Sequence, residues 1–325
     1  MFQVASRPPT HFSSMQVEHY SHSPSLTPSH LSMPRTLARP ALNQVIPQSV
    51  TAFAPDLSGV PIEYIRRHLA SQSHDMLNAL SMLSIPSSLP RSRVPTSIDA
   101  SLRPSQHIPD FTWFPTHVLA VTATKSSPSS PSTPTVASFA AQMASTSSST
   151  VPLYPTHALV LTAYCTLLPS MPHNHPQAST TGRNATVNLP VVRLSVPSSE
   201  TFPILHAYLH TKRADTLLAS LLPSLASSFP PASGPSTSST RAIYVTQFTR
   251  DRMRRLAESL MSYCFSQSGP QGAYATLMSN AKAINGLWRN VCALGIQDPE
   301  LWGVMDLAWE IVLTGLNCLT DRDRR

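Results

Sequence analysis

Two pairs of histidines have the residue type and spacing of metal ligands. His206 and His210 are four residues apart in a predicted helix, which places both rings on one face. His173 and His175 flank Asn174 in a predicted loop between prolines. A zinc site needs three or four ligands, usually with cysteine or carboxylate partners, and neither segment supplies them. We therefore interpret both pairs as structural or solvent-exposed residues, and we predict no metal and no cofactor.

Cys165, with His157 upstream, has the residue types of a nucleophile and its base. A reactive thiol needs an electropositive and accessible setting, whereas Cys165 lies in the apolar run 157–168. A buried structural cysteine is therefore favoured. The other three cysteines also lie among apolar residues and none belongs to a C-x-x-C pair, so we expect no disulfide framework and a reducing compartment. They are Cys264, Cys292 and Cys318.

Four acidic residues follow one another along the last predicted helix: Asp298, Glu300, Asp306 and Glu310. Helix capping and solubility are their simplest roles, rather than paired acid–base catalysis. The sequence contains no phosphate-binding loop, no zinc-protease motif and no nucleophile elbow, and its nine glycines are too few for a nucleotide cradle. We predict that the protein is not an enzyme, that it has no catalytic residues, and that it takes no small-molecule substrate.

The formal net charge of +7 comes mainly from arginine, with only three lysines in 325 residues. The clearest basic cluster is Arg250, Arg252, Arg254 and Arg255. A solvated helix face is the favoured interpretation. The alternatives are a nuclear import signal and a DNA-binding surface, because nucleic-acid binders cluster their basic residues on one face.

The first residues, MFQVASRPP, have no apolar stretch of the kind that marks a secretory signal. No run approaches the ~20 apolar residues that span a bilayer. We therefore expect a nuclear or cytoplasmic protein that is neither secreted nor bound to a membrane.

Thirty-two prolines and long Ser/Thr tracts divide the chain into ordered and disordered parts. The N-terminal region 1–55, rich in Ser, Pro and His, is predicted to be disordered, although its apolar piece 41–50 could dock on the core. We also predict a low-complexity insertion at 125–150 and a linker at 223–241. The ordered parts are then 56–124 (helix and strand), 151–222 (strand and helix) and 242–320 (three C-terminal helices).

The predicted elements before residue 225 follow from apolar spacing. Apolar residues from Ile62 to Leu83 recur at helical spacing, with a break near 71–73, and Pro86 ends the helix. The prolines at 90, 95 and 104 predict an irregular stretch. Strands are predicted at 117–123 and 191–196, a helix at 157–168, and a loop at 169–182. Ser198 or Ser199 should cap the next helix, which carries Phe202 and Tyr208 inward, and a short helix should cover 215–222.

The C-terminal third has the clearest helical pattern. We predict helices at 243–266 and 272–294, separated by Gly269-Pro270, with Tyr263 and Trp288 facing inward. Gly295 should end the second helix in a left-handed conformation, and Asp298 should cap the third. The second and third helices should form an antiparallel hairpin. Five large side chains are predicted to anchor the core: Trp288, Trp302, Trp309, Phe202 and Tyr208.

The predicted fold class is α+β and predominantly α-helical. One discontinuous helical core with a few short strands should be interrupted by long disordered Ser/Pro-rich segments.

Four segments of the chain resemble the clampless proteins of basidiomycete fungi. They are Val60–Leu80 (VPIEYIRRHLASQSHDMLNAL), Val151–Pro169 (VPLYPTHALVLTAYCTLLP), Phe202–Pro223 (FPILHAYLHTKRADTLLASLLP) and Ala281–Leu316 (AKAINGLWRNVCALGIQDPELWGVMDLAWEIVLTGL). The resemblance implies a regulator of sexual development, with roles in clamp-cell formation and maintenance of the dikaryon. It also implies protein contacts in the mating-type homeodomain pathway, with homeodomain transcription factors as candidate partners, and residence in the nucleus.

A second resemblance concerns residues 191–213 (VVRLSVPSSETFPILHAYLHTKR), which are similar to the strand–helix passage of a BTB/POZ interaction domain. The upstream run HALVLTAYCTLL resembles an earlier helix of that domain. Lys212 and Arg213 replace the threonine–glycine ending that the domain usually has. This resemblance implies a BTB/POZ-like interaction adaptor.

Three functional hypotheses follow from the sequence. The first is a non-enzymatic regulator of fungal sexual development that acts by protein–protein interaction. The second is a DNA-binding regulator that uses the basic helix at Arg250–Arg255, and the third is the BTB/POZ-like adaptor.

Overall fold

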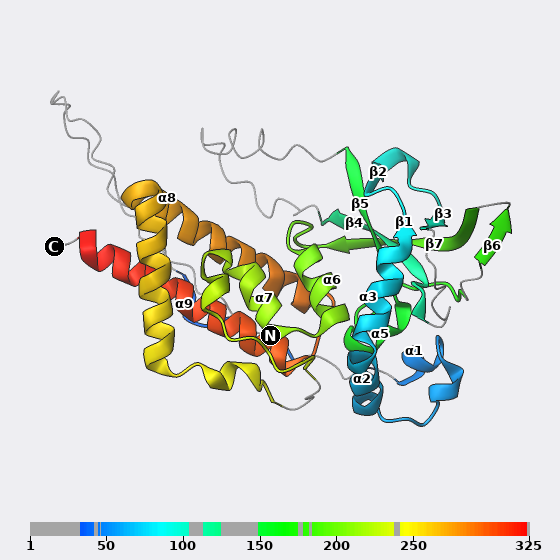
Figure 1. Cartoon of the computed structure of the whole chain (residues 1–325), viewed down its shortest axis with the longest axis horizontal. Helices are drawn as coiled ribbons and strands as arrows, with labels where there is room; N and C mark the ends of the chain where they lie inside the picture. Colours follow the sequence, from blue (N-terminus) through cyan, green and yellow to red (C-terminus); the bar gives the residue numbers. More distant parts are fainter. Residues whose placement is uncertain are drawn as a thin grey trace, which may run out of the picture. The chain divides into compact units, whose positions relative to one another are not determined.

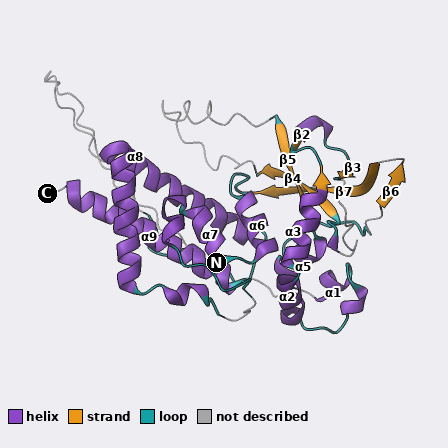
Figure 2. Ribbon diagram, in the orientation of Figure 1, coloured by secondary structure: helices purple, strands orange, loops and turns teal. Residues whose placement is uncertain are grey.

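The structure is a computed structural model that describes residues 33–41, 45, 47–103, 113–124, 149–174, 178–181, 184–236 and 241–323. The chain divides into two units, Met1–Pro34 and Arg35–Arg325, and only the second is described below. It combines a sheet with helices, and most of its regular structure is helical (Figures 1 and 2). The predicted fold class, α+β and mostly helical, is therefore confirmed. The predicted insertion at 125–150 lies almost entirely outside the described residues.

The sheet has seven strands in the order β1-β3-β7-β4-β5-β2, and β6 pairs with β7 outside this path. The strands are β1 (Leu83–Ser84), β2 (Ser88–Pro90), β3 (Ser97–Leu102), β4 (His117–Ala123), β5 (Thr150–Thr156), β6 (Ala178–Thr181) and β7 (Asn184–Val196). All pairings are antiparallel except the one between β4 and β7. A parallel pair needs a crossover, and here the chain makes it through β5 and α5 (Ala158–Tyr164).

Several strands lie in segments that the sequence predicted to be irregular because of their prolines. The irregular stretch predicted around Pro90 and Pro95 instead contains β2, the short 3₁₀ helix η2 (Arg91–Arg93) and β3, and the predicted loop 169–182 contains β6. In β3, alternation of polar and apolar residues buries Ala100 completely. β2 ends the sheet, where a proline costs no ladder hydrogen bond. Pro190 lies inside β7, between the residues that pair with β6 and those that pair with β4.

Two helices follow the predicted apolar face at 62–83. They are α2 (Ile62–Ser71) and α3 (Ser73–Met82), and the chain breaks at Gln72, within the predicted interval. Ile65, Leu69 and Met76 are buried as expected, whereas Leu77 is exposed. α2 packs against α5, and α3 packs against α6 (Phe202–Thr211). The helices thereby connect the sheet to the second half of the chain.

The strand predicted at 191–196 is the second half of β7, which begins at Asn184. The helices that follow it are present, with one error at a helix start. α6 and α7 (Ala214–Leu221) carry Phe202, Leu205, Tyr208 and Leu209 inward. However, α6 begins after Thr201, whose side chain makes no capping hydrogen bond, so the cap predicted at Ser198 or Ser199 is wrong. The predicted linker begins with the 3₁₀ helix η4 (Pro223–Ser228), which buries Leu225.

The C-terminal helices are η5 (Tyr244–Gln247), α8 (Arg250–Ala293) and α9 (Pro299–Asp323). Gly269 has φ 67° and ψ −171°, so α8 is two helices joined at a kink, as Gly269-Pro270 predicted (Figure 1). Leu256, Leu260 and Cys264 form the buried strip of its first half at a spacing of four. Tyr263 lies beside that strip and is 47% exposed, so the prediction that it faces inward is wrong.

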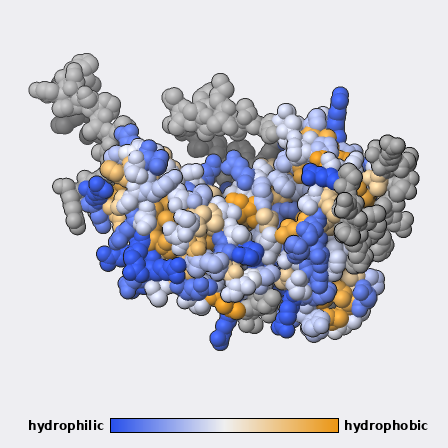
Figure 3. Space-filling view, in the orientation of Figure 1, coloured by the Kyte–Doolittle hydropathy of each residue, from blue (hydrophilic) through white to orange (hydrophobic). Residues whose placement is uncertain are grey.

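The end of the predicted disordered N-terminal region is packed on the core. In the second unit, residues 35–41 and 45 are described together with α1 (Pro47–Thr51) and the 3₁₀ helix η1 (Pro55–Leu57), and Leu37, Val45 and Val50 are buried. The burial of Val45 and Val50 agrees with the docking predicted for the apolar piece 41–50, whereas the prediction of disorder is wrong for residues 35–40 and for η1. Residues 1–32 lie outside the description. In the space-filling view, hydrophobic residues form small patches separated by hydrophilic ones (Figure 3). Among the described residues, no helix is both long and apolar enough to cross a membrane.

A buried polar junction as the candidate functional site

Two acidic residues of the last helix are buried rather than solvated. Asp298 is 4% and Glu300 is 1% exposed, so the solubility role predicted for them is wrong. Asp298 does cap α9, because its Oδ1 accepts hydrogen bonds from the backbone N–H groups of Glu300 (3.1 Å) and Leu301 (3.3 Å). A buried carboxylate needs further partners to offset its desolvation, and α6 supplies the first of them.

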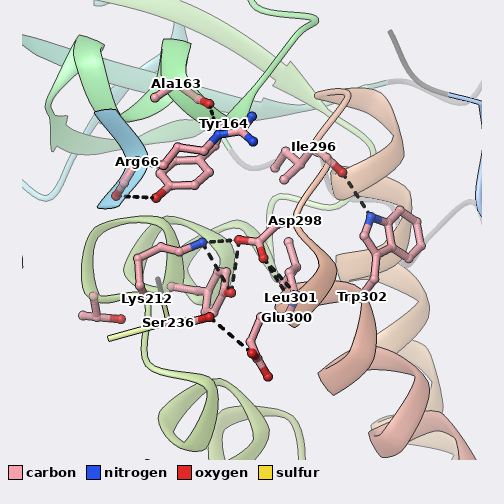
Figure 4. Close-up of polar contacts among 12 residues, drawn as sticks. Arg66, Ala163, Tyr164, Lys212, Ser236, Ile296, Asp298, Glu300, Leu301 and Trp302 are labelled. Carbon is pink, nitrogen blue, oxygen red and sulfur yellow. Dashed lines mark hydrogen bonds and ion pairs between the residues drawn. The ribbon is translucent and has the colours of Figure 1, made fainter. Parts of the chain in front are cut away.

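Lys212, the residue after α6, forms a buried ion pair with Asp298 (Figure 4). The hydroxyl of Tyr208 also donates to Asp298, at 3.1 Å. The Lys212 ammonium lies 4.1 Å from the ring centre of Tyr164 and 4.5 Å from that of Tyr208. Both rings therefore provide cation–π contacts where water is excluded.

The backbone of Lys212 has φ 52° and ψ 27°, the left-handed conformation that usually belongs to glycine. Its N–H donates to the carbonyl of Tyr208 at 2.7 Å, which ends α6, and its carbonyl accepts from the N–H of Ser236 at 2.8 Å. This backbone turn points the lysine side chain toward Asp298 (Figure 4). A lysine in this conformation costs free energy, which the ion pair offsets.

Glu300 extends the junction to the segment before α8. Its carboxylate accepts from the backbone N–H groups of Ile243 (2.8 Å) and Tyr244 (2.9 Å), and from the Ser236 hydroxyl (3.2 Å). Three donors thus satisfy a side chain that is almost completely buried. Glu300 thereby binds the chain on both sides of residues 237–240, which lie outside the described residues.

Arg66 of α2 attaches the junction to the first half of the chain. Its Nε donates to the carbonyl of Ala163 at 2.7 Å, and its guanidinium lies 5.3 Å from the ring centre of Tyr164. The Tyr164 hydroxyl donates back to the Arg66 carbonyl at 3.3 Å. Beside it, the turn between α8 and α9 is bound to the end of α5, where the N–H of Thr166 donates to the carbonyl of Leu294 at 3.1 Å.

Burial governs the protonation of the junction. It lowers the pKa of Lys212, and the neighbouring Asp298 carboxylate opposes that shift. Burial, reinforced by Asp298, raises the pKa of Tyr164 and of Tyr208. A lysine with a lowered pKa beside tyrosines has the residue types of an acid–base site. However, the side chain of Lys212 is only 4% exposed, so its arrangement is that of a structural contact in the interior of the molecule.

Family models match most of the chain. One describes the N-terminal domain of clampless protein 1 and matches residues 40–197, and another describes its C-terminal domain and matches residues 215–325. The chain belongs to the clampless protein family. Searches of curated proteins and of solved structures returned no match. The BTB/POZ resemblance therefore stays a prediction, although the strand and both helices on which it relied are present as β7, α5 and α6.

The junction lies where the two clampless domains meet. Arg66 and Tyr164 belong to the N-terminal match, Asp298 and Glu300 belong to the C-terminal match, and Lys212 lies in the unmatched interval between them. Sequence analysis identified Asp298 as a cap but missed its partner. The sequence drew attention to Lys212 only because Lys212 and Arg213 replace the threonine–glycine ending of the BTB/POZ passage.

A second buried polar contact attaches the C-terminal clampless domain to the interval between the two domains through Asn290 of α8, which is completely buried. Its Oδ1 accepts from the N–H of Ser198 at 2.8 Å, and its Nδ2 donates to the Ser198 carbonyl (2.7 Å) and to the Thr201 hydroxyl (3.1 Å). The Asn290 amide thereby bonds to both the N–H and the carbonyl of Ser198, in the turn that leads from β7 to α6.

Replacing Asn290 by alanine is expected to lower the free energy of unfolding by about 1–3 kcal/mol per polar group left buried without a partner. Urea denaturation followed by circular dichroism measures this loss. Asn285→Ala is a matched control on the same helix, because the Asn285 Oδ1 is buried without a partner and its removal should cost less. Equal losses for the two variants would contradict the assigned role of Asn290.

The predicted histidine pair lies in a cluster of three. His157 and His210 are buried and His206 is partly buried, and the ring centre of His210 lies 4.4 Å from that of His206 and 5.3 Å from that of His157. One nitrogen of each ring has no hydrogen-bond partner. In the described part of the chain, no group of three ligating side chains is placed to hold a metal ion. Burial, with smaller contributions from neighbouring histidines, lowers the pKa of His157 to about 3 and that of His206 well below its ordinary value, and burial lowers that of His210 to about 4.

The other candidate residues of the sequence analysis are dispersed. Cys165 is 4% exposed, and burial raises the pKa of its thiol to about 12, which disfavours the thiolate that a nucleophile needs. All four cysteines are free. His173 is exposed and its ring packs against Phe53, whereas His175 lies outside the described residues.

Four of the five predicted core anchors are buried: Trp302, Trp309, Phe202 and Tyr208. Trp288 is only partly buried, because it lies at the surface of α8 and contacts the N-terminal segment. In the basic cluster, the Arg252 guanidinium packs on the ring of Phe248, and Arg254 pairs with Glu258 at 2.9 Å. Arg250 and Arg255 are exposed.

Proposed function

We propose that this clampless-family protein is a non-enzymatic regulator of fungal sexual development that acts by binding other proteins. The observation that carries the proposal is the match of both clampless domains, at residues 40–197 and 215–325. The family supports a clampless-type developmental regulator. The finer role follows the resemblance and consists of clamp-cell formation and maintenance of the dikaryon, through contacts with the mating-type homeodomain proteins in the nucleus.

The polar residues of the buried junction form structural contacts, which favours a binding role over a catalytic one. Lys212, Asp298 and Glu300 have the residue types of a reactive site, yet their polar atoms bond to each other or to the backbone in the interior. Residues used in this way hold the two domains together and leave the outer surface for partners.

The direct test replaces the gene in a dikaryon-forming strain by a null allele and then restores the full chain. Loss of clamp cells in the null strain and their return with the full chain is the expected result. Proximity labelling from the restored protein in dikaryotic nuclei should recover the homeodomain proteins. Normal clamp cells in the null strain would refute the developmental role. Recovery of no transcriptional or cell-cycle protein would refute the proposed partners.

DNA binding through the start of α8 is a second candidate, favoured by the exposure of Arg250 and Arg255. If this surface binds DNA, changing all four residues of the Arg250–Arg255 cluster to alanine should lower the affinity at least tenfold. The slope of log affinity against log salt should also fall by about 0.9 for each phosphate that the protein no longer neutralises. Fluorescence anisotropy with a short duplex measures both quantities. Arg250→Lys with Arg255→Lys is the charge-preserving control, and an unchanged slope in the alanine variant would exclude this surface.

A further inference from the structure

The surface of the α8–α9 hairpin carries a short extended segment from the other end of the chain. The indole N–H of Trp288 donates to the carbonyl of Ala38 at 2.8 Å. The Arg39 guanidinium pairs with the Asp306 carboxylate and lies 5.5 Å from the ring centre of Trp302. Leu37 is 7% exposed. Ala38 and Arg39 thus make a hydrogen-bonded and an ionic contact with the hairpin, and Leu37 just before them is buried.

The hairpin side chains are arranged as a fixed receptor for these contacts. Trp302 and Asp306 are four residues apart and therefore share a face of α9. The Trp302 indole is held in place because its N–H donates to the carbonyl of Ile296 at 3.1 Å (Figure 4). The aromatic face and the carboxylate together fit a planar guanidinium, which stacks and pairs at once, better than an ammonium.

The ion pair that attaches the bound segment to the hairpin is exposed to solvent, although Leu37 is buried. The side chain of Arg39 is 53% exposed and that of Asp306 is 39% exposed, and exposed ion pairs of this kind contribute little to stability. Residues 37–41 belong to no helix or strand. The segment is held by a few side-chain contacts that another peptide of the same chemistry could reproduce. Its covalent attachment gives it the advantage of a high effective concentration.

We infer that the surface formed by Trp288, Trp302 and Asp306, which we call the Trp–Asp surface, is a recognition site for an extended Leu-x-Arg segment of a partner protein. Residues 37–39 of the chain are its internal, replaceable ligand. A partner segment would bind by placing its leucine, the following carbonyl and its arginine where Leu37, Ala38 and Arg39 lie. This inference deepens the proposed function, because it names where and by what chemistry a protein partner is bound.

The test uses the full-length protein and a fluorescent peptide with the sequence of residues 34–41, PRTLARPA. The variant Leu37→Ala with Arg39→Ala weakens the internal ligand. Fluorescence anisotropy should show that the peptide binds this variant at least tenfold more tightly than it binds the wild type. The peptide PRTLAEPA, in which glutamate replaces the arginine, should bind the variant at least tenfold more weakly than PRTLARPA. Equal binding of the two peptides, or equal affinity of PRTLARPA for variant and wild type, overturns the inference.

A charge-reversal variant keeps the test decisive if the double substitution perturbs folding. Asp306→Arg leaves the segment unchanged but repels Arg39, so this variant should bind PRTLAEPA in preference to PRTLARPA. Light scattering tests whether the occupant is a second copy of the chain. A wild-type dimer that becomes a monomer in the double variant would show that the segment of one copy binds the surface of another copy. That result would overturn the inference that the ligand belongs to a partner protein. The readout is binding by purified protein, so its failure is distinguishable from a failure of the developmental role.

Discussion

Replacing Lys212 by alanine is expected to lower the free energy of unfolding by about 3–5 kcal/mol, the usual cost of removing one partner of a buried ion pair. The loss is large because the Asp298 carboxylate stays buried and keeps only the Tyr208 hydroxyl and the α9 backbone as donors. Denaturation in urea, with equal slopes for wild type and variant, measures the difference.

Two further variants separate the ion pair from the backbone. Lys212→Gly removes the same charge but suits the left-handed conformation, so it should be about 1 kcal/mol more stable than Lys212→Ala. Lys212→Met combined with Asp298→Asn removes both charges and keeps a capping residue at 298, and it should recover much of the loss. A cost below about 1 kcal/mol for Lys212→Ala would show that the pair is not buried as described.

Acidification is expected to destabilise the protein steeply through the histidine cluster. The folded-state pKa values of about 3 for His157 and about 4 for His210 lie below the ordinary value of 6.5. The unfolded chain therefore takes up protons first, and the stabilisation that is present above pH 6.5 is lost as the pH falls toward these values. Each histidine contributes about 1.4 kcal/mol per pH unit, so these two together should cost about 4 kcal/mol at pH 5. His206 acts in the same direction.

The pH dependence can be assigned to the cluster by one substitution. His210→Leu removes a titrating group whose Nε2 is buried without a partner, so the variant should be little affected at pH 7.5 and should lose less stability at pH 5. His74→Gln, at an exposed position of α3, controls for the loss of a histidine as such. Thermal unfolding between pH 7.5 and 5 gives the comparison. The same pH dependence in His210→Leu and the wild type would rule the cluster out.

Periodicity and capping signals predicted the helices well because those signals are local. The break after Ser71, the kink at Gly269 and the cap at Asp298 each depend on residues within one or two turns. The strands β1, β2, β3, β5 and β6 were not predicted. Prolines lie in or near β2, β3 and β5, and β6 (ASTT) does not alternate polar and apolar residues. In a sheet, the cost of a proline depends on whether its missing N–H faces a neighbouring strand, and a single sequence does not show this.

The polar junction depends on residues that are distant in the sequence. Lys212 and Asp298 are 86 positions apart, and Asn290 and Ser198 are 92 apart. Nothing in the spacing around Asp298 or Glu300 distinguishes a buried carboxylate from a solvated one. The histidine cluster could be predicted only in part. The four-residue spacing predicted a shared face for His206 and His210, but it did not predict that His157, at the start of α5, lies next to them.

The family models divide the chain between residues 197 and 215, but contacts at residues 164–167, 198, 212 and 290–300 connect the parts on either side. We therefore expect the two clampless domains to unfold as one cooperative unit. A fragment that ends in this interval would lack Asp298 as the partner of Lys212 and Leu294 as the acceptor for Thr166, and would expose apolar surface that is covered in the whole chain. Isolated halves should therefore aggregate or unfold, and failure of a half to bind would not mean that its surface is inert. Binding partners are best mapped with single surface substitutions in the intact chain.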